Sequence, residues 1–142
     1  MAHACIGALE RRPNRAVQVA AAALLFDVCA SLPNSVESPL KGRCEWLSRL
    51  ATGRERSVHV LGAQLTALAA RSLTPDESKA FVDRLSNDTK SAATTIQATT
   101  TLRCLSLVCC ALPLLNNAHY SQALSAAVEA AIDASQRSSS AA

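Results

Sequence analysis

Aromatic residues are scarce in this chain: one Trp, one Tyr and two Phe account for 3% of its 142 residues. Glycine and proline, which interrupt helices, are also few, at four and five residues. The Val and Ile residues show no sustained alternation with polar residues, the pattern that would indicate a strand. The 28 alanines and 19 leucines must therefore form most of the core, and both are strong helix formers. The composition predicts an all-α fold, and the length suits one domain.

Lysine is rare as well, with three residues against eleven arginines, and the net charge is only +3. Nucleic-acid binding usually shows as a concentrated basic face interleaved with aromatic residues. No arginine run in this sequence carries such aromatics, so we expect no nucleic-acid partner. Arginine is better suited than lysine to fixed ion pairs and protein interfaces.

The cysteines contain no C-x-x-C pair; they are Cys5, Cys29, Cys44, Cys104, Cys109 and Cys110. Zinc sites normally use paired ligands at short spacing. His3 and Cys5 could supply one pair of ligands, but no second pair accompanies them. We interpret the cysteines as buried, reduced thiols, which is typical of a reducing intracellular compartment. We expect no metal and no other cofactor.

The N-terminal region superficially resembles a targeting segment, because Arg11, Arg12 and Arg15 precede an apolar run over residues 16–25. Pro13 and Asp27 argue against a signal peptide. A second apolar run, over residues 104–115, is too short to span a bilayer. We expect no transmembrane helix and a cytoplasmic location, with the mitochondrion as the alternative.

One part of the sequence is repeated. At an offset of 41, residues 15–24 align with 56–65, and the coinciding pairs are Arg15/Arg56, Val17/Val58, Val19/Val60, Ala22/Ala63 and Leu24/Leu65. A fainter third copy starts 80 residues after the first, where residues 28–33 meet 108–113. A period near 40 in helix-forming sequence predicts stacked helical hairpins. Paired positions should then be equally buried.

This alternation of repeated helices with shorter partner helices resembles HEAT or armadillo-type repeats, in which antiparallel helix pairs stack into a curved layer. The resemblance covers about residues 14–137 and rests on period and helix order. It implies an α-solenoid-like array of about three antiparallel helical hairpins that binds or scaffolds other proteins. A compact five- or six-helix bundle is the alternative fold.

The chain divides into a flexible basic segment at 1–13, a single all-helical domain at 14–137 and a frayed tail at 138–142. Six helices are predicted, over about 14–31, 38–53, 54–72, 74–90, 90–112 and 117–137. The clearest start is the capping box of Thr74 and Glu77, with Pro75 between them. Ser38 and Pro39 predict a second start. Gly62 predicts a close approach between the third helix and a neighbour.

The candidate partner-binding residues are Arg11, Arg12, Arg15, Arg54 and Arg56. Stacked repeats would align these arginines along one edge, as a basic ridge for an acidic protein surface. The alternative is a solvated edge with ion pairs to nearby glutamates.

No catalytic residues are predicted, because the sequence has no nucleophile elbow and no glycine-rich phosphate loop. His59 aligns with Gln18 and is expected to face solvent. Asp27 is expected on the polar outer face of a terminal unit. We expect a non-catalytic protein-interaction or scaffold subunit of a larger assembly, with no small-molecule ligand. The alternative is a helical accessory subunit of an organellar (mitochondrial) membrane complex.

Overall fold

The computed structural model describes residues 1–33, 35–112 and 117–140, without the side chains of residues 117 and 138–140. Every regular element in these ranges is helical, so the fold class is all-α. The elements are α1 (Ala2–Glu10), α2 (Arg15–Ala30), α3 (Cys44–Thr52), the 3-10 turn η1 (Arg56–Val58), α4 (His59–Ala70), α5 (Pro75–Lys90), α6 (Thr95–Ala111) and α7 (Asn117–Ser140).

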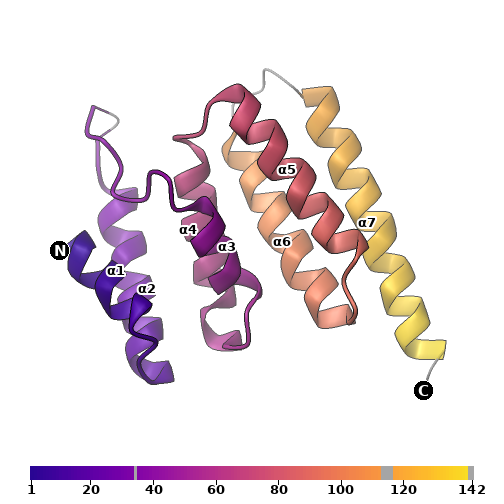
Figure 1. Ribbon diagram of the computed structural model, residues 1–142, viewed down its shortest axis with the longest axis horizontal. Helices are drawn as coiled ribbons and strands as arrows, with labels where there is room; N and C mark the ends of the chain where they lie inside the picture. The colour runs from indigo at the N-terminus through magenta and orange to yellow at the C-terminus, as the bar shows by residue number, and fades with distance from the viewer. Residues whose placement is uncertain (34, 113–116, 141–142) are drawn as a thin grey trace.

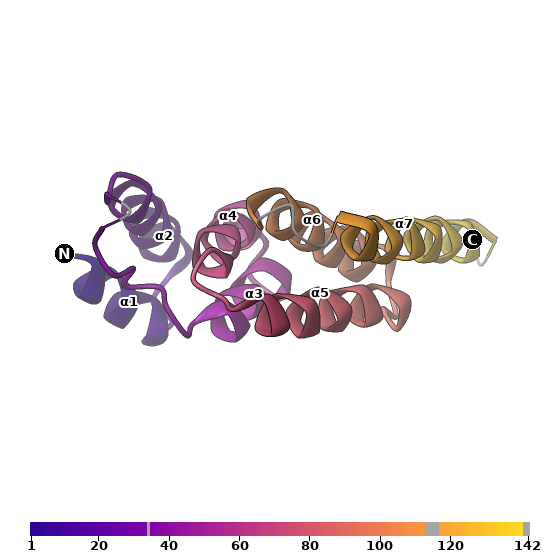
Figure 2. The same cartoon turned by 90° about the horizontal axis from the view of Figure 1, so that it is seen from above.

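The helices form two layers (Figures 1 and 2). One layer holds α2, α4, α6 and α7 side by side, and the other holds α1, α3 and α5. Successive helices pair as α1–α2, α3–α4 and α5–α6, and α7 packs against both α5 and α6. The first two pairs meet through α2, which contacts α4 and η1.

The core is built mainly from leucine and alanine, as the composition predicts. Each helix from α2 to α6 contributes one leucine that is at most 1% exposed: Leu25, Leu47, Leu65, Leu85 and Leu105. Buried alanines fill the spaces between them and let the helices approach closely.

Close approach is greatest where Gly62 of α4 meets α3. A Cβ at this position would lie only 2.7 Å from the amide nitrogen of Ala51, so the expected contact at Gly62 is confirmed. The capping box is confirmed as well. The Thr74 hydroxyl accepts from the Glu77 amide at 3.3 Å, and the Glu77 carboxylate accepts from the Thr74 amide at 2.9 Å.

Two of the repeated pairs differ in burial, contrary to expectation. Val17 and Leu24 are 43% and 44% exposed, whereas Val58 and Leu65 are 1% and 0% exposed. The reason is position: α4 lies between α2 and α6, while α2 ends its layer. At these two pairs the 41-residue offset does not relate equivalent environments, whereas Ala22 and Ala63 are both 1% exposed as expected. Membership of a HEAT or armadillo family stays a prediction.

The expected flexible segment at 1–13 is wrong. Residues Ala2–Glu10 form α1, whose Ile6 and Leu9 are buried against α2. At the other end, α7 continues to Ser140 rather than ending near residue 137. Residues 141–142 of the expected tail lie outside the described ranges.

Two helix starts also differ from prediction. α3 begins at Cys44, whereas the helix predicted over 38–53 was expected to begin at Ser38–Pro39. A series of turns occupies the residues before Cys44. Gly42 in these turns has φ +77°, a left-handed conformation that ends any helix started before it. α6 begins at Thr95, whereas the helix predicted over 90–112 was expected to begin near Lys90. The Thr94 hydroxyl caps α6.

Within the ranges that the structure describes, no helix combines the length and the apolar character that crossing a bilayer requires.

Candidate interaction surface

The five candidate arginines lie at one end of the first two helix pairs. Arg11 and Arg12 follow α1, Arg15 begins α2, and Arg54 and Arg56 lie between α3 and α4, in turns at the same end of the molecule (Figure 1). All five are exposed. An ion pair of 3.3 Å between Arg15 Nε and Glu55 Oε1 connects the two turns.

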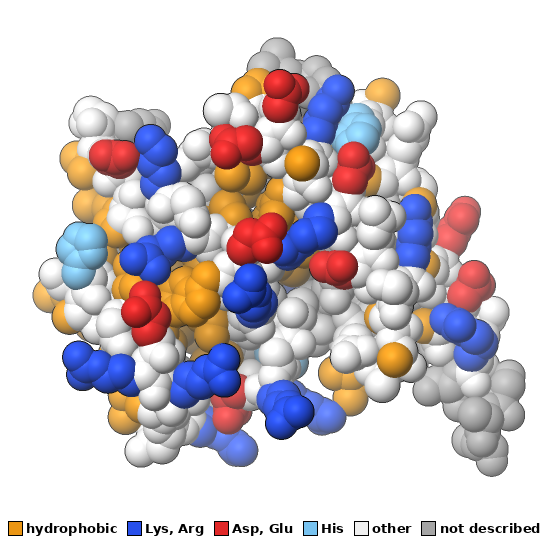
Figure 3. Space-filling model, viewed as in Figure 1, with side chains coloured by type: hydrophobic (Ala, Val, Ile, Leu, Met, Phe, Trp, Pro, Cys, Tyr) orange, Lys and Arg blue, Asp and Glu red, His pale blue; other side chains and the backbone are white. Residues whose placement is uncertain are grey.

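Beside this end, a groove of about 480 Å³ lies between α1 and α3. Its apolar lining comes from Leu9 and Val58, which are buried, and from Trp46 and Leu50, which are half-buried. Its charged lining comes from both walls and the turn beside η1: Glu10, Arg12, Arg49, Arg54 and Glu55. Figure 3 shows hydrophobic side chains between α1 and α3 with Lys or Arg side chains on both sides. We call this feature the basic groove.

The two glutamates of the basic groove are already neutralised. Glu10 Oε1 lies 3.1 Å from Arg43 Nη1, and Glu55 is paired with Arg15. Hydrogen bonds from the Ser57 hydroxyl and amide lower the pKa of Glu55, so this acid stays ionised at neutral pH.

Arg12, Arg49 and Arg54 form no ion pair with any residue that the structure describes. The groove therefore carries three uncompensated positive charges around an apolar lining. Arg12 and Arg54 were among the sequence candidates, whereas Arg11, Arg15 and Arg56 lie outside the lining.

Sequence reasoning missed Trp46 and Arg49. A usable signal was present, because Arg43, Trp46 and Arg49 recur at intervals of three from the N-cap of α3, so each lies beside the next. The Arg43 guanidinium lies 5.7 Å from the centre of the Trp46 ring, a cation–π arrangement that holds the indole at the groove.

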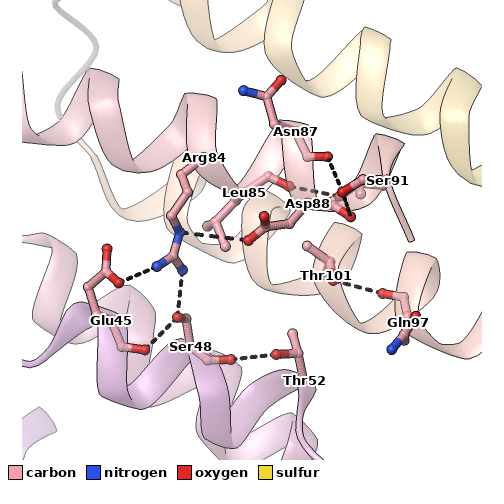
Figure 4. Close-up of polar contacts among 11 residues, drawn as sticks. Glu45, Ser48, Thr52, Arg84, Leu85, Asn87, Asp88, Ser91, Gln97 and Thr101 are labelled. Carbon is pink, nitrogen blue, oxygen red and sulfur yellow. Dashed lines mark hydrogen bonds and ion pairs between the residues drawn. The ribbon is translucent and has the colours of Figure 1, made fainter. Parts of the chain in front are cut away.

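A second polar cluster surrounds Arg84 of α5 (Figure 4). Its guanidinium pairs with Glu45 and donates to the Ser48 hydroxyl at 2.8 Å, both on α3, and lies 3.7 Å from Asp88. It also lies over the Phe81 ring at 5.2 Å. Nη1 and Nη2 of Arg84 are thus both engaged with α3. The cluster connects α3 to α5, and we interpret its role as structural.

A small cavity of about 270 Å³ adjoins that cluster and is lined by hydroxyl groups. The hydroxyls of Thr52, Ser91 and Thr101 each donate to a carbonyl oxygen of their own helix, as Figure 4 shows. Their protons are thus used within the helices, and no charged group lies unpaired in the cavity.

The expectation that His59 faces solvent is wrong. Its side chain is 5% exposed, and Nε2 lies 2.6 Å from the Gly53 carbonyl oxygen. The aligned residue does not face solvent either: Gln18 is half-buried, and its Nε2 donates to the Pro13 carbonyl oxygen at 2.6 Å, so both side chains reach back to the turn before their helix. His119 Nε2 lies 2.9 Å from Asp83 Oδ1, joining α7 to α5. Asp27 is exposed, as expected of a terminal unit.

The cysteines are all free thiols. Burial raises the pKa of Cys44, Cys104 and Cys109 to about 11, which suppresses the reactive thiolate. Cys110 is exposed. In the described part of the chain, no three His, Cys, Asp or Glu side chains come together in a way that could hold a metal.

Comparison with protein-family models, with curated proteins and with solved structures gave no match to this chain.

Proposed function

We propose that this chain is a non-catalytic protein-interaction subunit of a larger assembly, and that its arginine-bearing end binds an acidic protein surface. One observation carries the proposal. Five exposed arginines from two separate turns gather at one end of the molecule, and only Arg15 among them has an ion-pair partner in the described structure.

The rigidity of this end supports an interface rather than a loose charged tail. The first turn is fixed by α1, whose Leu9 is buried, and the second by η1, whose Val58 is buried. The Arg15–Glu55 pair links the two turns. Because the backbone that carries these arginines is already fixed, less conformational entropy is lost on binding than with a mobile segment.

The chemistry of the end favours protein over nucleic acid. Arginine binds carboxylates through paired hydrogen bonds, whereas single-stranded nucleic acid needs several aromatic platforms. Trp46 is the only aromatic side chain in the groove lining, and Arg43 already lies over its ring.

A quantitative affinity purification tests the proposal. The tagged chain is compared with the double variant Arg54→Glu, Arg56→Glu and with the control Arg103→Glu, which reverses an exposed arginine on α6. We expect one or more proteins to be captured by the wild type and the control but lost with the double variant. Purified partner should then bind with an on-rate that falls as salt rises.

Two outcomes count against the proposal. Equal capture by all three forms would show that the arginine end is only a solvated surface. Capture that is lost on nuclease treatment would show that nucleic acid is the partner instead.

A further inference from the structure

The basic groove offers more than charge, because its lining combines guanidinium groups with apolar side chains. The apolar surface that the groove still exposes comes from Trp46 and Leu50, which are half-buried, whereas Leu9 and Val58 are already covered, at 2% and 1% exposure. A flat acidic protein surface would leave this apolar lining uncovered. A side chain that enters the groove would bury it.

We infer that the basic groove takes a short acidic segment of the partner that also carries an apolar side chain, such as leucine. This inference rests on the proposed function and specifies the partner's binding element. The apolar side chain enters between α1 and α3, against Trp46 and Leu50, and neighbouring carboxylates contact Arg12, Arg49 and Arg54.

Charge complementarity identifies this occupant. The three arginines that line the groove lack ion pairs, while its two glutamates are held by Arg43 and Arg15. An incoming carboxylate therefore meets three free guanidinium groups, while each glutamate of the lining is engaged in an ion pair. The volume of about 480 Å³ falls in the range of about 300–1,000 Å³ typical of sites for small ligands and inserted side chains.

The backbone at Arg12 supplies an independent observation. Arg12 follows the C-cap of α1, and its φ is +49°, in the left-handed region. Glycine is the usual residue at this position because it lacks a Cβ. A non-glycine residue here is strained, and such strain is concentrated at functional sites. In this chain the strained residue also lines the groove and has no ion-pair partner.

Trp46 is the only tryptophan in the chain, so its fluorescence reports on the groove directly. The probe is a tryptophan-free, glutamate-rich peptide with two leucines spaced four residues apart. The matched control peptide has serine in place of both leucines. A single-stranded oligonucleotide serves as a polyanion without an apolar anchor. We expect the leucine peptide to change the Trp46 emission and to bind at least about tenfold more tightly than either control.

Protein variants locate the binding site. Arg49→Gln removes one guanidinium and should weaken the leucine peptide about tenfold or more, whereas Arg103→Gln on α6 should not change its affinity. Arg12→Gly should weaken binding while the melting temperature stays equal to or rises above that of the wild type, because glycine relieves the left-handed strain. A purely structural role for Arg12 would not separate binding from stability in this way.

Three results would overturn the inference: equal binding of the leucine and serine peptides, tighter binding of the oligonucleotide, or no binding of any probe. If the inference fails while Arg54→Glu, Arg56→Glu still abolishes partner capture, the proposed function stands and the partner binds outside the groove. If capture is also unaffected, both fail.

Discussion

Substitution of Gly62 by alanine has two opposing effects on stability: alanine favours the helix, but its methyl group clashes with α3. In an exposed helix interior, Gly→Ala stabilises by up to about 1 kcal/mol, because alanine restricts the unfolded backbone. At Gly62 the new methyl group would lie 2.7 Å from the Ala51 nitrogen, 2.9 Å from the Leu50 carbonyl carbon and 3.0 Å from the Ala51 Cα. These are backbone atoms of α3, so no side-chain rotation can relieve the clash.

The magnitude follows from the displacement that the methyl group requires. Carbon atoms pack at about 3.5–4.0 Å, so α3 must move away from α4 by roughly 0.5–1 Å. Overpacking of this kind typically costs about 1–3 kcal/mol, and a backbone clash belongs at the upper end. After subtraction of the helix-propensity gain, we expect Gly62→Ala to destabilise the fold by about 2 kcal/mol.

Gly7 of α1 provides a matched control, because a Cβ there would meet no atom within 4 Å. Gly7→Ala should therefore stabilise by about 0.5–1 kcal/mol. Urea denaturation followed by far-UV circular dichroism measures both variants under one set of conditions. If Gly62→Ala proved as stable as Gly7→Ala, the close approach of α3 and α4 would be refuted.

Four further predictions concern the core, the surface and the thiols. Leu65→Ala should cost about 2–5 kcal/mol in a urea titration, since Leu65 is fully buried between helices and truncation leaves a cavity; a silent variant would invert the assignment of inside and outside. Arg56→Glu should change stability by less than about 0.5 kcal/mol in the same titration, because Arg56 is exposed. At pH 8, an alkylating reagent should modify exposed Cys110 long before Cys104, whose pKa of about 11 leaves roughly one thiolate in a thousand; equal rates measured by mass spectrometry would contradict this. The Cys104 pKa is raised in the folded state, so the free energy of unfolding that this thiol contributes should be complete below about pH 9 and lost as the pH rises toward 11. The loss should be at most about 2–3 kcal/mol, and Cys104→Ala should flatten the decline.

Local signals in the sequence were sufficient where the structure depends on neighbouring residues. The capping box at Thr74 and the end of α2 near Leu32 and Pro33 depend on side chains within one turn. Such features survive because their energetics are local. The burial of Cys44 and Cys104 also agrees with the interpretation of the cysteines as buried thiols, although α3 starts later than expected.

Features that depend on tertiary neighbours could not be predicted in the same way. The nine-residue α1 is too short to be stable as an isolated helix and forms because Ile6 and Leu9 are buried against α2. The burial of His59 depends on the Gly53 carbonyl across the turn before α4. The exposure of Val17 depends on α2 having no helix beyond it in its layer. None of these conditions can be deduced from the residues concerned, because each depends on a neighbouring element of the fold.

The basic groove combines features that the sequence predicts with features that depend on tertiary packing. Its arginines were visible in the sequence as charges at helix ends, but its cavity arises from packing. The first two helix pairs meet through α2 rather than through α1, so α1 and α3 stand apart and leave Trp46 half-buried between them. The Glu10–Arg43 pair then joins the two walls and removes one negative charge from the groove. The close packing of α3 on Gly62 of α4 also contributes to the position of α3. A small residue outside the groove therefore contributes to the geometry that we propose a partner recognises.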